Sequence, residues 1–113
     1  MPLTIYHNPR CSKSRETLTL LEKRDLKPKI VLYLDDPPTA DDIKGLLKKL
    51  GLKAHDLLRR KDASALGLNP DSMTEAQVIV AMVKHPVLIE RPVVVNGAKA
   101  ALGRPPEAVL AIL

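Results

Sequence analysis

The chain has 113 residues, a formal net charge of +5 and a single cysteine. This length suits one domain with one hydrophobic core, so we expect a single domain over residues 1–113. One cysteine excludes an intramolecular disulfide, which fits a reducing cytosol.

The positive charge invites a nucleic-acid interpretation, which other features of the composition oppose. Phe and Trp are absent, two tyrosines are the only aromatic residues, and the basic residues are interleaved with acidic ones. A small anionic substrate explains the charge as well as a polynucleotide does. The N-terminus lacks the apolar stretch of a secretion signal, and no apolar run reaches membrane-spanning length. We therefore expect a cytoplasmic monomer that binds neither nucleic acid nor membranes.

The first half of the chain predicts a strand, a helix, a strand and a second helix. Leu3–Tyr6 is a short apolar run, residues 12–25 have a helical pattern, and residues 29–34 are rich in β-formers. Thr39 is a good N-cap for the second helix. This helix has apolar residues at helical spacing and ends at Gly51: Ile43, Leu46, Leu47 and Leu50.

The second half predicts short helices followed by a hairpin. Residues 54–60 suggest a helical turn and residues 61–71 a loop, and a capping box of Thr74 and Gln77 begins a helix that ends near residue 84. An Asn-Gly pair at residues 96–97 separates two β-rich runs and is typical of a hairpin. The last predicted helix begins at Pro105 and carries Val109, Leu110 and Leu113.

This order of elements predicts an α/β fold. Two early strands joined by a helix should be parallel, and the late hairpin adds an antiparallel pair, which gives a mixed four-stranded sheet. The arrangement is thioredoxin-like, with a helical insertion between the βαβ and ββα halves. In such a fold the cysteine lies at the end of the first strand, as Cys11 does here.

Cys11 stands where the first strand gives way to a helix, and this position favours a reactive thiolate. The free N–H groups and the positive end of the helix dipole stabilise the ionised form, and we expect Arg10, Lys13 and Arg15 to do the same. Ser14 occupies the last place of a C-x-x-C spacing. Because the chain has no second thiol, an external thiol must regenerate Cys11.

Three arginines at predicted element ends are candidates to bind an oxyanion beside Cys11: Arg59, Arg91 and Arg104. A cysteine-phosphatase loop is excluded, because the residue six after Cys11 is Thr17 and not arginine, and no glycine-rich nucleotide motif occurs. The histidines lack metal-ligand spacing with Cys11, so we predict no metal. Two interpretations of His7 stay open: it faces the thiol, or it is a hydrogen-bonded loop residue.

The chain resembles the glutaredoxin-dependent arsenate reductases of the ArsC family over essentially its whole length. The motif around the cysteine (residues 5–15) carries the resemblance, and the stretch at residues 85–95 is the most specific one after it. Further matching segments lie at residues 33–34, 37–39, 57–59 and 103–107.

The resemblance implies that Cys11 attacks arsenate held by the three arginines, that His7 and Ser14 support the thiolate, and that Pro92 is a cis-proline. It implies no bound cofactor, with glutathione as reductant and glutaredoxin releasing the thiol. Two alternatives are a thiol-transfer enzyme acting on glutathione mixed disulfides and an Spx-like regulator that binds RNA polymerase. The presence of all three arginines favours the oxyanion enzyme.

Overall fold

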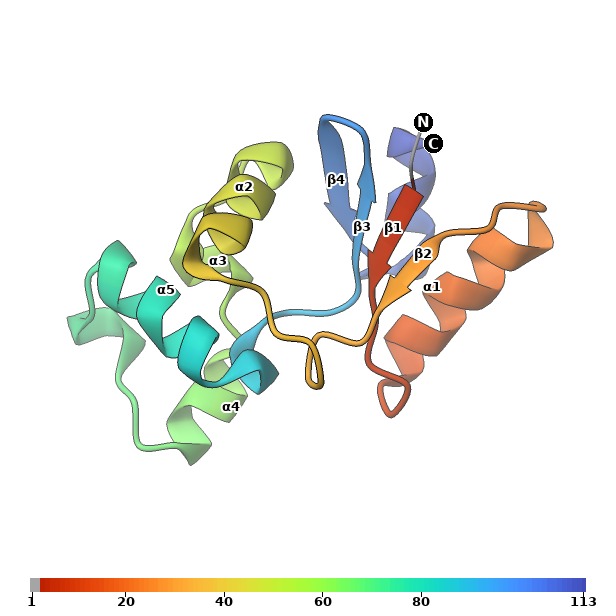
Figure 1. Cartoon of the computed structure of the whole chain (residues 1–113). Helices are drawn as coiled ribbons and strands as arrows, with labels where there is room; N and C mark the ends of the chain where they lie inside the picture. Colours follow the sequence, from red (N-terminus) through yellow and green to blue (C-terminus); the bar gives the residue numbers. More distant parts are fainter. Residues whose placement is uncertain (1–2) are drawn as a thin grey trace. The chain divides into compact units, whose positions relative to one another are not determined.

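The computed structural model describes residues 3–113, which form two compact units (Figure 1). We call the first, residues 3–36 together with Arg91–Leu113, the sheet unit. The second, Pro37–Glu90, contains helices and is called the helical unit. Each unit is described by itself, and one domain over residues 1–113 stays a prediction.

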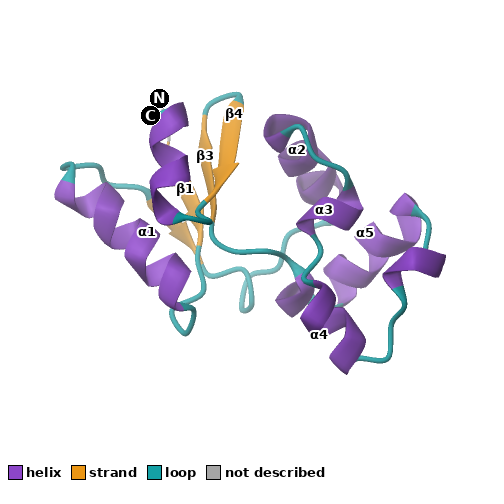
Figure 2. Ribbon diagram, turned by 180° about the vertical axis from the view of Figure 1, so that it is seen from behind, coloured by secondary structure: helices purple, strands orange, loops and turns teal. Residues whose placement is uncertain are grey.

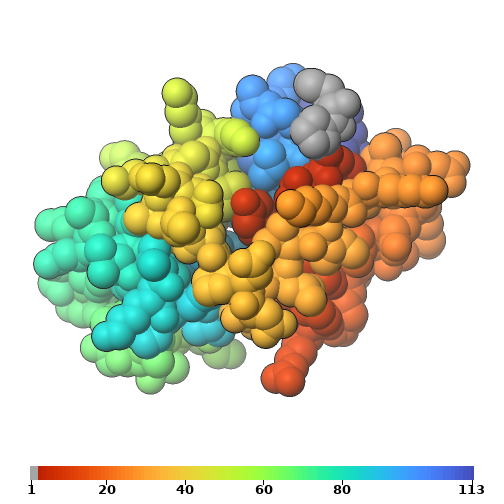
Figure 3. All heavy atoms as spheres, in the orientation of Figure 1, coloured from red at the N-terminus to blue at the C-terminus, as the bar shows by residue number. Residues whose placement is uncertain are grey.

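The sheet unit is built on four strands in the order β2-β1-β3-β4. The central strand β1 pairs parallel with β2 and antiparallel with β3, and β3 pairs antiparallel with β4. In the space-filling view the red atoms of β1 lie between orange and blue segments, as this order requires (Figure 3). The predicted mixed sheet and thioredoxin-like fold are confirmed. The strands are β1 (Leu3–Tyr6), β2 (Lys29–Val31), β3 (Val93–Asn96) and β4 (Lys99–Leu102).

Two helices lie together on one face of this sheet (Figure 2). They are α1 (Ser12–Lys23) and the C-terminal 3₁₀ helix η3 (Pro106–Ile112). Apolar side chains from both helices and from the two central strands meet in a fully buried cluster, and this burial holds α1 against the sheet. The cluster consists of Ile5, Leu21, Val94 and Val109.

The helical unit packs its elements around a second apolar core. Helix α5 contacts α2, α3 and the 3₁₀ turn η2. The buried side chains include Ile43, Leu57, Val78, Met82 and Leu88. The elements are α2 (Ala40–Leu50), α3 (Ala54–Leu57), α4 (Arg60–Ala65), η1 (Pro70–Ser72), α5 (Glu75–Lys84) and η2 (Pro86–Leu88).

Both predicted capping positions in the helical unit are confirmed. The Thr39 hydroxyl accepts from the N–H of Asp42 at the start of α2, and the Thr74 hydroxyl accepts from the N–H of Gln77 at the start of α5. In each case the side chain three residues on accepts from the cap N–H in return, which completes a capping box. Gly51 ends α2 with a φ of 69°, the left-handed conformation that glycine adopts without strain.

Several predicted boundaries are wrong. The first helix ends at Lys23 rather than at residue 25. Strand β2 ends at Val31, because the Leu32 carbonyl accepts from the N–H groups of Asp35 and Asp36 and the chain turns. The turn predicted at residues 54–60 is helical only to Leu57.

Residues 61–71 are not the loop that we predicted. They contain most of α4 and the start of η1. Only Ala63 of α4 is buried, so this helix has no apolar stripe that the sequence could reveal. The last helix occurs where predicted but has 3₁₀ geometry. Within residues 3–113, no helix is both long and apolar enough to cross a membrane.

Candidate functional site

Cys11 is the N-cap residue of α1, with an extended backbone that joins the loop after β1 to the helix. Its carbonyl accepts from the N–H of Arg15 at 3.0 Å, and its own N–H donates to the Asn8 carbonyl at 3.0 Å. The residue is partly exposed. The fold therefore presents the thiol at the positive end of a three-turn helix while leaving it accessible.

The pKa of the Cys11 thiol is lowered below its ordinary value. Burial by itself raises this pKa, because it disfavours the charged form. That effect is outweighed by the backbone N–H of Ser14, the side chain of Arg91, the backbone N–H of Lys13 and the charge of Arg104. Cys11 closes no regular N-cap hydrogen bond, so the two N–H groups act on the sulfur as dipoles rather than as a regular cap.

Two of the three predicted arginines lie at this thiol. Arg91 immediately precedes β3, and Arg104 follows β4 after Gly103. The Arg104 Nη2–H group points at Cys11 Sγ at 3.6 Å, and its Nε–H donates to the Arg91 carbonyl at 2.8 Å. The Arg91–Pro92 and Arg104–Pro105 peptide bonds are both cis, and the first of these matches the prediction for Pro92.

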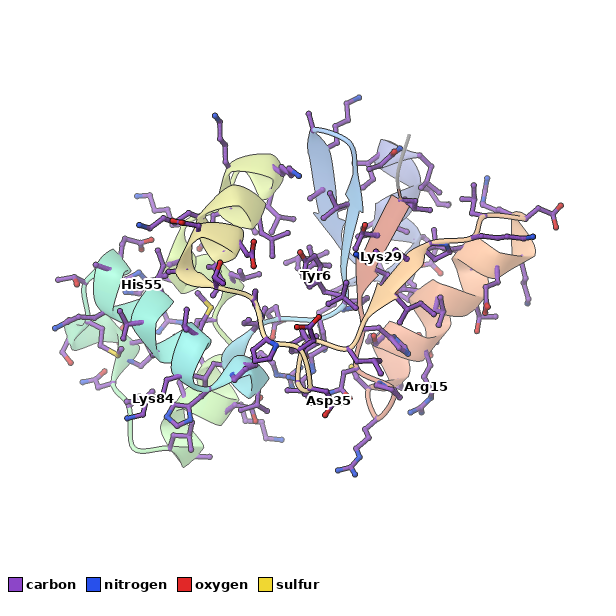
Figure 4. All side chains as sticks on the ribbon, in the orientation of Figure 1. Tyr6, Arg15, Lys29, Asp35, His55 and Lys84 are labelled. Atoms are coloured by element: carbon purple, nitrogen blue, oxygen red, sulfur yellow. The ribbon has the colours of Figure 1, made fainter. Side chains whose placement is uncertain are left out.

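The cations adjacent to Cys11 in sequence have other partners. Lys13 Nζ lies 3.7 Å from Glu16 Oε2 on the surface of α1. Arg15, labelled in Figure 4, donates from Nη1 to the Pro9 carbonyl at 2.8 Å. The cationic side chains that lower the pKa of the thiol are therefore Arg91 and Arg104, rather than the nearby ones that we expected.

His7 and Ser14 form a buried hydrogen-bond network behind the thiol. The Asn8 N–H donates to Ser14 Oγ at 3.0 Å, and Ser14 Oγ lies 2.6 Å from His7 Nδ1. Because the serine oxygen already accepts a hydrogen bond, its own hydrogen is available for Nδ1 of a neutral imidazole. Burial, followed by the charge of Arg15, lowers the pKa of His7 and keeps the ring neutral.

This network links the loop before Cys11 to the first turn of α1. Ser14 provides its side chain to His7 and its backbone N–H to the sulfur. Of the two open interpretations of His7, the structure has the hydrogen-bonded loop residue. Asn8 is a site residue that the sequence analysis missed, although Asn before Pro is a turn signal. Its Oδ1 accepts from the N–H of Arg10 at 3.0 Å.

Arg59 belongs to the helical unit, where it is the N-cap residue of α4. Its Nε–H donates to Asp62 Oδ2 at 2.7 Å and lies 3.6 Å from Glu90 Oε1. The backbone N–H donates to the Leu88 carbonyl at 2.7 Å. These contacts fix the base of the side chain, which is only 20% exposed. They occupy Nε, while an oxyanion would use the two Nη groups.

Two surface cavities of the sheet unit border the cysteine loop in sequence. One, of about 410 Å³, runs along α1 from Ser12 to Lys23 and is closed by Pro106 and Glu107 of η3. The other, of about 300 Å³, is lined by His7 to Arg10 and by Leu32, Leu34 and Asp35. Among residues 3–113, no group of three or more His, Cys, Asp or Glu side chains could hold a metal ion.

Comparison with known proteins agrees with this architecture. The model of the ArsC family matches residues 6–112. An arsenate reductase of Haemophilus influenzae is 47% identical over 116 residues, which cover 100% of both chains. The uncharacterized protein YfgD of Escherichia coli K12 is 51% identical over 112 residues, which cover 96% of this chain and 94% of that one.

Solved structures give the same answer. An arsenate reductase from Vibrio cholerae superposes with a TM-score of 0.89 at 42% identity, and the match covers 100% of this chain and 98% of that one. The family match and the full-length relatives agree in extent with the cysteine motif and with the fold. This chain belongs to the ArsC family.

Proposed function

We propose that the protein is an arsenate reductase that uses glutathione and glutaredoxin as reductants. The observation that carries the proposal is the pairing of a thiol of lowered pKa with a guanidinium group 3.6 Å from its sulfur. A thiolate and an oxyanion repel each other, so their reaction requires fixed positive charge beside both. Arg91 and Arg104 supply this charge at Cys11.

In the first step the Cys11 thiolate attacks the arsenic atom of arsenate. A sulfur–arsenic bond forms, and one arsenate oxygen leaves as water after protonation. Arsenic stays pentavalent in this step, so no electrons are transferred. Planar guanidinium groups suit the tetrahedral oxyanion, because each can donate two parallel hydrogen bonds to its oxygens.

In the second step glutathione attacks the Cys11 sulfur. A disulfide bond forms, the sulfur–arsenic bond breaks, and its electron pair stays with arsenic, which becomes trivalent and leaves as arsenite. Two thiols are thereby oxidised to one disulfide while arsenate is reduced by two electrons. Glutaredoxin then removes glutathione from Cys11 by thiol–disulfide exchange.

The single cysteine of the chain supports an external reductant. Ser14 stands where a resolving thiol would be needed, and its hydroxyl is engaged with His7. We propose that Ser14 and His7 support the thiolate by holding the loop and the first turn of α1, and that the protein holds no cofactor. The names of the Haemophilus and Vibrio relatives further support arsenate as the substrate.

Arg59 is proposed as the third arginine that binds the oxyanion. Its support is the match of the Leu57-Leu58-Arg59 segment to the family motif and the fixed position of its Nε, which leaves the two Nη groups to form a fork. The carboxylates of Asp62 and Glu90 orient the guanidinium within the helical unit.

A coupled assay tests the proposal. With glutathione, glutaredoxin, glutathione reductase and NADPH, we expect arsenate-dependent NADPH oxidation by the wild-type protein and none by Cys11→Ser. Omitting glutaredoxin should slow turnover strongly. If the oxidation needs no arsenate and follows an added glutathione mixed disulfide instead, the protein is a thiol-transfer enzyme and the proposal is wrong.

A further inference from the structure

Gly103 occupies a point where three segments of the sheet unit come too close for a side chain. A Cβ atom at this position would lie 2.4 Å from Thr17 Oγ1 and 2.6 Å from Pro92 Cγ. Both separations are below 3.0 Å, which Cβ contacts in proteins essentially never reach. Gly103 therefore permits a close approach between the end of β4, the start of β3 and α1.

Neither neighbour can move aside easily. Thr17 is fully buried, its β-branched side chain has few rotamers, and its hydroxyl donates to the Lys13 carbonyl at 2.8 Å. Pro92 is buried as well, and its ring is rigid. Even one added methyl group at residue 103 would therefore displace the backbone or separate it from α1.

The displaced segment carries both arginines of the thiol site. The Gly103 N–H donates to the Pro92 carbonyl at 3.0 Å, and Arg91 and Arg104 directly flank this hydrogen-bonded pair. The Arg104 Nε–H then returns to the Arg91 carbonyl. On the other side, Thr17 belongs to the helix that Cys11 begins. The contact at Gly103 thus sets the spacing between the arginines and the thiol.

We propose that Gly103 is a positioning residue for the thiol site: its missing side chain lets Arg91 and Arg104 approach Cys11 closely enough to act on it. The residue contacts neither substrate nor sulfur, and it acts through the two arginines. This inference rests on the proposed function only where turnover is measured, because the state of the thiol can be measured without arsenate.

The test compares Gly103→Ala with Gly45→Ala, the same substitution at a helical glycine that has no atom within 4 Å of the added Cβ. The rate of alkylation of Cys11 against pH gives the pKa of the thiol in each variant. For Gly103→Ala we expect a higher pKa and an alkylation rate at neutral pH that falls about threefold or more, since one pKa unit is a factor of ten in thiolate. Arsenate turnover should fall as well, and Gly45→Ala should match wild type in both measurements.

A double variant separates positioning from general damage. Adding Thr17→Ala to Gly103→Ala removes the closer of the two clashes, so we expect part of the lowered pKa to return. A folded Gly103→Ala protein with the wild-type pKa at Cys11 overturns the proposal. If Gly103→Ala does not fold, Thr17→Val carries the test, because it places a bulkier methyl group against Gly103. An unchanged pKa of Cys11 in that variant also overturns it.

Discussion

At the scale of single residues, the reactivity of Cys11 comes from two different sources. Its position as the N-cap of α1 could be predicted, because an apolar run followed by a helical pattern places the cysteine at the junction. The charges that act on it could not be predicted from proximity in sequence. Arg91 and Arg104 reach the thiol through the sheet pairing of β3 and β4, while Lys13 and Arg15 turn to Glu16 and Pro9.

Our first prediction tests this assignment of the charges. Arg104→Ala should raise the pKa of Cys11, because it removes the guanidinium group 3.6 Å from the sulfur. At neutral pH less thiolate is then present, so alkylation should slow. Arg10→Ala, a change of the exposed arginine directly before the cysteine, is the matched control and should leave the pKa unchanged. A larger shift in Arg10→Ala than in Arg104→Ala would reverse the assignment.

The second prediction concerns the buried hydroxyl of Ser14. Ser14→Ala removes the hydrogen-bond partner of the Asn8 N–H and of His7 Nδ1 in a buried site. Leaving such groups without a partner costs about 1–3 kcal/mol, so urea unfolding should show a loss of this size. Ser12→Ala, at an exposed position two residues earlier, serves as control. Equal stabilities of the two variants would mean that the network contributes nothing to the fold.

At the scale of elements, local signals determined which helices could be predicted. Thr39 and Thr74 each begin a capping box, and the apolar residues that follow have helical spacing, so α2 and α5 begin where we expected. Helix α4 gave no such signal, because it buries only Ala63 and Arg59 does not cap it with a side-chain hydrogen bond. Its first turn is held by the ion pair of Arg59 with Asp62, a contact that periodicity cannot reveal.

His55 holds together three elements of the helical unit, and Figure 4 marks it there. Its Nδ1 contacts Glu75 Oε1 on α5, and its Nε2 lies 3.1 Å from the Pro70 carbonyl and 3.0 Å from the Met73 carbonyl. All of these partners are acceptors, so the doubly protonated ring satisfies them best. The hydrogen bond to Glu75 is the main cause that raises the pKa of His55, and the bond to His55 in turn lowers the pKa of Glu75.

A dependence of stability on pH follows as the third prediction. A raised pKa means that the contribution of His55 is complete below its unfolded pKa near 6.5 and is lost as pH rises through the folded value. The contribution of Glu75 is complete above about 4.5 and is lost as pH falls through the folded value. His55→Gln should therefore lower the melting temperature most between these limits and least in alkaline solution.

The control for this measurement is His85→Gln at the end of α5. Thermal melts of wild type and both variants across the pH range give the two differences. A difference for His55→Gln that stays constant from acidic to alkaline pH would show that the ring acts only through packing.

At the scale of the whole molecule, the order of elements was sufficient to predict the sheet. A strand–helix–strand start and a late hairpin leave few arrangements, and the observed order β2-β1-β3-β4 is the thioredoxin-like one. The division into a sheet unit and a helical unit left no signal in composition, because no linker or low-complexity tract marks residues 36–37 or 90–91. Each unit instead forms its own core.

The fourth prediction addresses the arginine that the helical unit contributes. Arg59→Lys keeps the charge but loses the planar fork, so we expect kcat/KM for arsenate to fall about tenfold or more. The pKa of Cys11 should stay unchanged, because we attribute its lowering to Ser14, Arg91, Lys13 and Arg104. Arg60→Lys, at the next residue, which pairs with exposed Asp71 at 3.1 Å, is the control. Equal activity of the two lysine variants would remove Arg59 from the proposed site.

The central claim, that Cys11 reacts with arsenate and is released by an external thiol, has one direct measurement. Protein, glutathione and arsenate are mixed without glutaredoxin, and intact-mass analysis counts the glutathione attached to the chain. The account predicts one glutathione per chain, bound at Cys11, formed together with an equal amount of arsenite and only when arsenate is present. A mixed disulfide that forms equally without arsenate, or arsenite produced by Cys11→Ser, would contradict it.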